Sequence, residues 1–127
     1  MSLTDENKAF IQEMISSKRR LEDYPDRFDD DLIMHEPASL PFGGTYRGLG
    51  EFQKFYPSVR AFYDFERFEL LGVYGDGDIV FATIRAGLVG SAGTIHLAEQ
   101  FLFAGSKLVE VRLHICDDGA AAKRLRR

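Results

Sequence analysis

The second half of the chain most restricts the possible folds, because four strand-like stretches follow one another with only short connections between them. Each connection contains glycine, and connections this short join neighbouring antiparallel strands. In the last stretch, apolar and polar residues alternate strictly from Val109 to Cys116, which gives that strand one apolar face. The pattern predicts an antiparallel meander built from residues 65–74, 78–88, 94–103 and 107–116.

In the first half of the chain, apolar residues recur mostly with the spacing of an α-helix. Residues 4–20 predict a helix with Thr4 as N-cap, an apolar stripe from Phe10 to Ile15, and basic residues in its last turn. Residues 49–63 predict a second, Phe-rich helix that Pro57 should kink or split. Between these helices we expect a short helix or irregular turn at 21–28, a strand at 31–36, and a loop that begins at Pro37.

Helices that precede a curled antiparallel sheet are typical of the α+β class. Helices packed on one face of such a sheet leave a cone, and a cone of this size can enclose a pocket. The length of 127 residues fits one domain. We therefore expect a single domain over residues 1–119, with the basic segment 120–127 as a tail.

Composition narrows the classes of function. The net charge of −4 argues against nucleic-acid binding through a broad basic face. No apolar run approaches the ~20 residues that a membrane span needs, and the polar start of the chain does not resemble a secretion signal. We expect a cytoplasmic protein with no membrane partner. The single cysteine, Cys116, excludes an internal disulfide and a multi-cysteine metal site.

Glu99 is the most informative residue, because the alternating face from Ile95 to Phe103 places its carboxyl among four large apolar side chains. If that face points inward, the carboxyl loses solvation and holds its proton more tightly. A protonated carboxyl can donate a hydrogen bond to a developing oxyanion. The alternative is that the twist of the sheet lets Glu99 reach solvent or an arginine such as Arg85.

Glu36 shares a strand face with Leu32 and Met34 and stands directly before Pro37. A half-desolvated carboxylate at a strand end can act as a general base, although it can also be a solvated charge. Tyr46 either supplies a phenol to the pocket or packs against Phe42. The three histidines show no metal-ligand spacing, so we expect neither a metal nor a cofactor.

Taken together, these marks resemble the NTF2-like superfamily, and within it the branch of ketosteroid isomerases and SnoaL-type polyketide cyclases. The marks are the opening helix, Met-His-Glu-Pro at 34–37, Leu-Pro-Phe-Gly-Gly-Thr-Tyr-Arg-Gly at 40–48, and Gly-Ser-Lys-Leu-Val-Glu-Val-Arg at 105–112. The resemblance implies that Glu36 corresponds to the general base of the isomerases, and Glu99 to their oxyanion-hole acid. Two departures stand out: the first helix has no tyrosine, and the final strand has no inward acid.

We therefore expect either of two functions. The first is an isomerase- or cyclase-like enzyme that moves a proton next to the carbonyl of a small apolar substrate, with Glu36, Glu99 and Tyr46 as catalytic residues. The second is a non-catalytic homodimer that binds an apolar ligand or a protein partner. The outer sheet face around Arg112 is the expected dimer contact. The expected pocket wall consists of Phe10, Met14, Met34, Phe55, Phe101, Val111 and Leu113.

Overall fold

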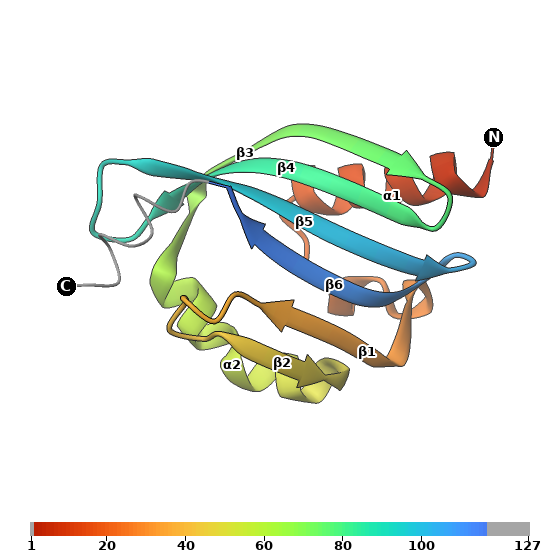
Figure 1. Ribbon diagram of the computed structural model, residues 1–127, viewed down its shortest axis with the longest axis horizontal. Helices are drawn as coiled ribbons and strands as arrows, with labels where there is room; N and C mark the ends of the chain where they lie inside the picture. Colours follow the sequence, from red (N-terminus) through yellow and green to blue (C-terminus); the bar gives the residue numbers. More distant parts are fainter. Residues whose placement is uncertain (1, 117–127) are drawn as a thin grey trace.

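The computed structural model describes residues 2–116 as two helices packed on a curved six-stranded sheet (Figure 1). Helix α1 packs on β3 and β4, whereas α2 packs on β1, β2 and β3. The sheet order is β2-β1-β6-β5-β4-β3. The elements are α1 (Leu3–Ser16), β1 (Phe28–Glu36), β2 (Gly44–Arg47), α2 (Gly48–Phe62), β3 (Tyr63–Asp76), β4 (Ile79–Leu88), β5 (Thr94–Ala104) and β6 (Lys107–Ile115).

This architecture confirms the α+β class and the predicted meander, which is formed by β3 to β6. The sheet as a whole is mixed rather than purely antiparallel, because β1 pairs with β6 in parallel. These two strands are far apart in the sequence, so no short turn forces them to run in opposite directions. The edge strand β2 pairs with β1 and is not marked by the sequence pattern, because its four residues are too short to show a period.

Helix α1 ends four residues before the predicted end. Ser2, not Thr4, caps its start, because the Ser2 hydroxyl accepts a hydrogen bond from the Asp5 amide at 3.1 Å. At the other end Lys18 has a φ of +56°, and the Lys18 and Arg19 amides bond back to the Ile15 and Met14 carbonyls. These are the two hydrogen bonds of a Schellman motif. The basic residues predicted in the last turn therefore lie in the link that follows the helix.

The link contains two short 3-10 turns, at Leu21–Asp23 and Pro25–Arg27, in the region where a short helix or irregular turn was expected. Helix α2 continues through Pro57 as one element rather than splitting. Its buried residues lie on both sides of that proline, at Phe55, Val59 and Phe62. Burial of these side chains compensates for the ~3 kcal/mol that an interior proline costs a helix.

The strict alternation expected in β6 is interrupted near its start. Phe103 pairs with Leu108, whereas Leu102 pairs with Glu110, so Val109 is an extra residue in a β-bulge. Leu108, Val111 and Leu113 are consequently the buried residues of this strand, and Val109 is only half-buried. The bulge lets Leu108 share the inner face with Val111 and Leu113, although Leu108 and Val111 are three residues apart.

The buried residues form two clusters, one beneath α1 and the other beneath α2. Phe10 and Ile11 belong to the first cluster, and Phe55 and Val59 to the second. Phe52 and Leu70 pack against both. The core is therefore divided, and side chains from both halves are available to line a cavity where the halves meet.

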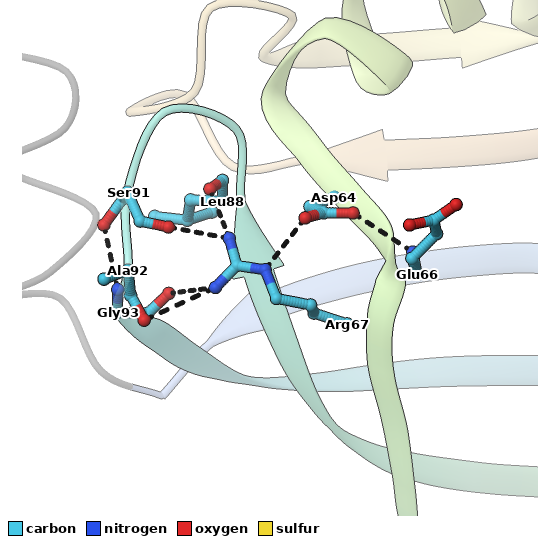
Figure 2. A network of polar contacts seen from close by, with 7 residues as sticks. All are labelled: Asp64, Glu66, Arg67, Leu88, Ser91, Ala92 and Gly93. Carbon is cyan, nitrogen blue, oxygen red and sulfur yellow. Dashed lines mark hydrogen bonds and ion pairs between the residues drawn. The ribbon is translucent and has the colours of Figure 1, made fainter.

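Arg67 fixes the beginning of β3 against the turn between β4 and β5, as Figure 2 shows. Its Nε donates to the Asp64 carboxylate at 2.8 Å, and its Nη2 donates to the Leu88 and Ser91 carbonyls at 2.7 Å each. Gly87 leaves room for this arrangement, since a Cβ there would lie 2.7 Å from the Arg67 side chain. The contacts hold in place the segment that carries the inward-facing aromatic residues at the start of β3.

None of the helices in residues 2–116 has both the length and the apolar character needed to cross a bilayer. The basic segment 120–127 lies outside the described residues, so its role as a tail stays a prediction.

Candidate functional site

A cavity of about 400 Å³ lies between the sheet and the helices and opens to the surface. Its inner wall comes from the sheet, where Met34, Ile84, Leu97, Phe101, Val111 and Leu113 are all buried. Its outer wall comes from α1, α2 and the start of β3, and includes several aromatic rings. Apart from the two carboxyls described next, the inner wall is apolar.

Glu99 lines this cavity from the middle of β5. Its neighbours two residues away, Leu97 and Phe101, are almost fully buried on the same face. Burial raises the pKa of Glu99 from 4.5 to about 7, because the ionised carboxyl has lost most of its hydration. Arg85 is not its partner, since that guanidinium pairs with Glu69 at 2.8 Å.

Glu36 lines the same cavity from the end of β1. Its Oε2 atom is buried and has no hydrogen-bond partner among residues 2–116. Burial is the main cause that raises its pKa from 4.5 to about 8, and the nearby charge of Glu99 adds to the shift. Both residues remain half-buried by surface area because the cavity itself is open, but protein surrounds each carboxyl. The two acids, 63 positions apart in the sequence, therefore share one apolar space.

Tyr63 places a buried phenol in the same cavity, and sequence reasoning did not single it out. It is the first residue of β3 and is 4% exposed. Its hydroxyl has no hydrogen-bond partner in the described part of the chain. Burial, followed by the charges of Glu36 and Glu99, raises the pKa of the phenol, so it stays protonated. The sequence places Tyr63 at the end of a Phe-rich helix, where nothing distinguishes it from a core aromatic residue.

Tyr46, which we expected to supply a phenol, does not line the cavity. Its hydroxyl donates to the Phe42 carbonyl at 2.9 Å, and its ring stacks on Phe55 at 3.9 Å between centroids. Phe10 and Phe55 are likewise core residues outside the cavity wall. The structure brings together Met14, Met34, Phe101, Val111 and Leu113, the other five residues expected in the wall.

The histidines lie away from the cavity. His35 Nδ1 is 3.1 Å from the Thr45 hydroxyl, and His35 Nε2 is 3.6 Å from the Glu110 carboxylate. His114 Nε2 is 3.0 Å from the Gln100 amide oxygen. Within residues 2–116, no group of three His, Cys, Asp or Glu side chains is arranged to hold a metal ion.

The chemistry open to this arrangement follows from the two raised pKa values. Two carboxyls that interact in one site ionise in two steps that belong to the pair. With values of about 7 and about 8, the pair holds one proton in the neutral range. One carboxyl is then a base and the other an acid, in an apolar environment where hydrogen bonds to a developing charge are strong.

Comparison with known proteins gives matches to solved structures only, since no family model and no curated protein matches the sequence. An NTF2-like protein from Burkholderia thailandensis matches with a TM-score of 0.78 at 17% identity, covering 100% of this chain and 99% of that one. An NTF2-like protein from Burkholderia pseudomallei matches with a TM-score of 0.74 at 18% identity, covering 99% of this chain and 97% of that one. A steroid delta-isomerase from Pseudomonas aeruginosa matches with a TM-score of 0.72 at 13% identity, covering 99% of this chain and 88% of that one. The chain therefore has the NTF2-like fold.

Proposed function

We propose that the protein catalyses cofactor-free proton transfer next to the carbonyl group of a small apolar substrate. One observation carries the proposal: two carboxyls with raised pKa values share a single apolar cavity. A base whose pKa lies near the working pH is the best compromise between being ionised and being strong enough to remove a proton. A cavity of about 400 Å³ suits a substrate of a few fused rings or a short chain.

In the proposed mechanism the singly protonated pair reacts in the form that carries its proton on Glu99. In that form the ionised Glu36 removes a proton from the carbon next to the carbonyl. The electron pair of the broken C–H bond moves into the carbonyl and makes an enolate oxygen. Protonated Glu99 donates a hydrogen bond to that oxygen. Glu36 then returns the proton to the same carbon or to another position of the conjugated system, so no oxidant or cofactor is consumed.

Tyr63 takes the role of second hydrogen-bond donor that we first expected of Tyr46. Its hydroxyl is near enough to both carboxyls for their charges to raise its pKa. The Tyr46 hydroxyl is already bonded to a backbone carbonyl. The absence of a tyrosine from α1 thus does not leave Glu99 as the sole donor, since the start of β3 supplies one.

The experiment is deuterium exchange into β-tetralone, an apolar two-ring ketone with acidic hydrogens on both sides of its carbonyl. The protein in D₂O should exchange these hydrogens faster than buffer does. The rate should follow a bell-shaped pH profile between about 7 and 8, because the active form holds one proton on the pair. Exchange no faster than buffer, with the ketone shown to bind, would instead make the chain a binding protein.

We also propose that a second copy of the chain packs on the outer face of the sheet. Glu110, Arg112 and His114 lie there in one row on β6, and Phe81 of β4 is 36% exposed beside His114. Such a mixed polar and aromatic face suits a self-complementary interface. Gel filtration should give about twice the chain mass of 14.4 kDa, and a mass of 14.4 kDa would exclude the dimer.

A further inference from the structure

Four basic side chains line the cavity on its helical side and take no part in the proposed proton transfer. Lys18, Arg19 and Arg20 come from the link that follows α1, and Arg60 comes from α2. Lys18, Arg19 and Arg60 are exposed while also lining the cavity, so they mark its entrance. A chain with a net charge of −4 thus lines one cavity with four positively charged side chains, three of them at its entrance.

The local fold explains how these residues meet. The Schellman motif at the end of α1 turns the chain at Lys18 and directs the next two residues along the cavity rather than along the helix axis. Arg20 then reaches α2, where its guanidinium lies 3.9 Å from the ring centroid of Tyr56. Arg60 is one helical turn beyond Tyr56, so it shares the same side of α2.

The four charges are not equally free to bind a ligand. Arg20 pairs with Glu22 at 3.0 Å. The hydrogen bond from Arg67 is the main cause that lowers the pKa of Asp64, and the nearby charge of Lys18 contributes to it. Asp64 is itself held mainly by Arg67 at 2.8 Å. Arg19 and Arg60 form no ion pair within residues 2–116. These two guanidiniums, one from the link after α1 and the other from α2, are therefore the ones available to an anion.

The charge on the two walls also differs in sign. The acid pair on the sheet side carries one negative charge when it holds a single proton, so an anion placed beside it would be repelled. The cations on the helical side attract an anion instead, and a positively charged entrance also concentrates anionic ligands from solution. An anionic group is thus favoured at the opening and disfavoured beside Glu36 and Glu99.

We propose that the substrate is an apolar carbonyl compound that carries a carboxylate, with the carboxylate bound between Arg19 and Arg60. A planar guanidinium can bind a carboxylate through two parallel hydrogen bonds, which fixes the orientation of the ligand as well as its position. The carbonyl end then points toward the acid pair. This inference rests on the proposed function only for the carbonyl, since the anion site depends on the basic residues alone.

Two fluorescent probes test the anion site directly. 2-Naphthol is an apolar phenol whose ionised form resembles an enolate, and 6-hydroxy-2-naphthoate adds a carboxylate to the ring remote from the hydroxyl. We expect the naphthoate to bind about tenfold more tightly than 2-naphthol at low salt, and the advantage to shrink as salt is added. Arg60→Gln should reduce this ratio of the affinities for naphthoate and 2-naphthol about fivefold. Arg19→Gln combined with Arg60→Gln should make the two affinities equal.

Lys54→Gln is the matched control, because Lys54 is an exposed cation of α2 that does not line the cavity. It should leave the affinity for both probes unchanged. Unchanged binding of 2-naphthol by the double variant shows that the cavity is intact. Equal affinity of the wild-type protein for the two probes, or a naphthoate advantage that survives in the double variant, would overturn the anion site.

The result of the probe-binding experiment can be told apart from the result of the β-tetralone experiment, which tests the proposed function. β-Tetralone has no charge, so its deuterium exchange depends on the acid pair and not on Arg19 or Arg60. A naphthoate advantage without tetralone exchange would leave the anion site standing and remove the proton-transfer activity. Tetralone exchange without a naphthoate advantage would support the proton-transfer activity and overturn the anion site.

Discussion

Glu36→Gln should lower the rate of deuterium exchange into β-tetralone by about 10²–10⁴-fold, the usual contribution of a general base. Glutamine has nearly the same shape as glutamate but cannot take up a proton. The variant should still bind 2-naphthol, because the substitution keeps the shape of the cavity wall. Glu69→Gln is the matched control, since Glu69 is an exposed carboxyl on β3 that pairs with Arg85 outside the cavity.

Glu99→Gln should lose less activity, by about tenfold to a hundredfold, because the amide N–H of glutamine still donates a hydrogen bond to the enolate oxygen. The same substitution removes the charge that helps to raise the pKa of Glu36. The bell-shaped pH profile should therefore become a single rising limb with a midpoint below pH 8.

The pair of variants also decides which carboxyl is the base. The lower pKa of Glu99, about 7 against about 8 for Glu36, makes Glu99 the first to ionise in the free protein. A large loss in Glu99→Gln with a small loss in Glu36→Gln would assign the base to Glu99. Exchange that survives both substitutions would remove the acid pair from the mechanism.

The folded protein should become less stable as the pH rises from about 4.5 to about 8. In this range the two carboxyls are protonated in the folded chain but ionised in the unfolded chain, where glutamate titrates near 4.5. Because the native state binds more protons, raising the pH favours unfolding. The stability that the protonated carboxyls provide is complete below pH 4.5 and is lost as the pH passes through their folded-state values.

The expected loss in the free energy of unfolding is about 2 to 5 kcal/mol between pH 5 and pH 8, after allowance for water in the open cavity. Urea denaturation at several pH values measures it. Glu36→Gln combined with Glu99→Gln should remove most of this dependence and be more stable than the wild type at pH 8. An equal pH dependence in the wild type and the double variant would show that neither carboxyl is perturbed.

Much of the fold, and the faces on which the two carboxyls lie, could be predicted from the spacing of apolar and polar residues along the chain. A strand of period two assigns each residue to a face, so the alternation from Ile95 to Phe103 grouped Glu99 with four apolar side chains but left open whether that face points inward. The structure shows that Glu99 lines the cavity. The alternation in β1 likewise grouped Glu36 with Leu32 and Met34. Glycine-rich turns fixed the order of β3 to β6, since short connections leave neighbouring strands no other pairing.

The remaining features depend on contacts between distant segments, which no local pattern encodes. Tyr63 and Tyr46 have the same side chain and similar aromatic neighbours, yet only Tyr63 reaches the cavity. The basic residues after α1 suited the end of a helix, and only the left-handed turn at Lys18 moves them to the entrance. The parallel pairing of β1 with β6 could not be predicted from a local pattern either, because it joins the first strand to the last.

Glu36 and Glu99 share an apolar cavity, and burial there keeps both carboxyls protonated well above the usual pH range of glutamate. Carbon-13 NMR of protein labelled at the glutamate side-chain carboxyls measures this directly, with Glu36→Gln and Glu99→Gln assigning the two signals. We expect two carboxyls that are still protonated at pH 6 and that titrate in two steps near 7 and 8. Ionisation of every glutamate near the ordinary value of 4.5 would contradict it.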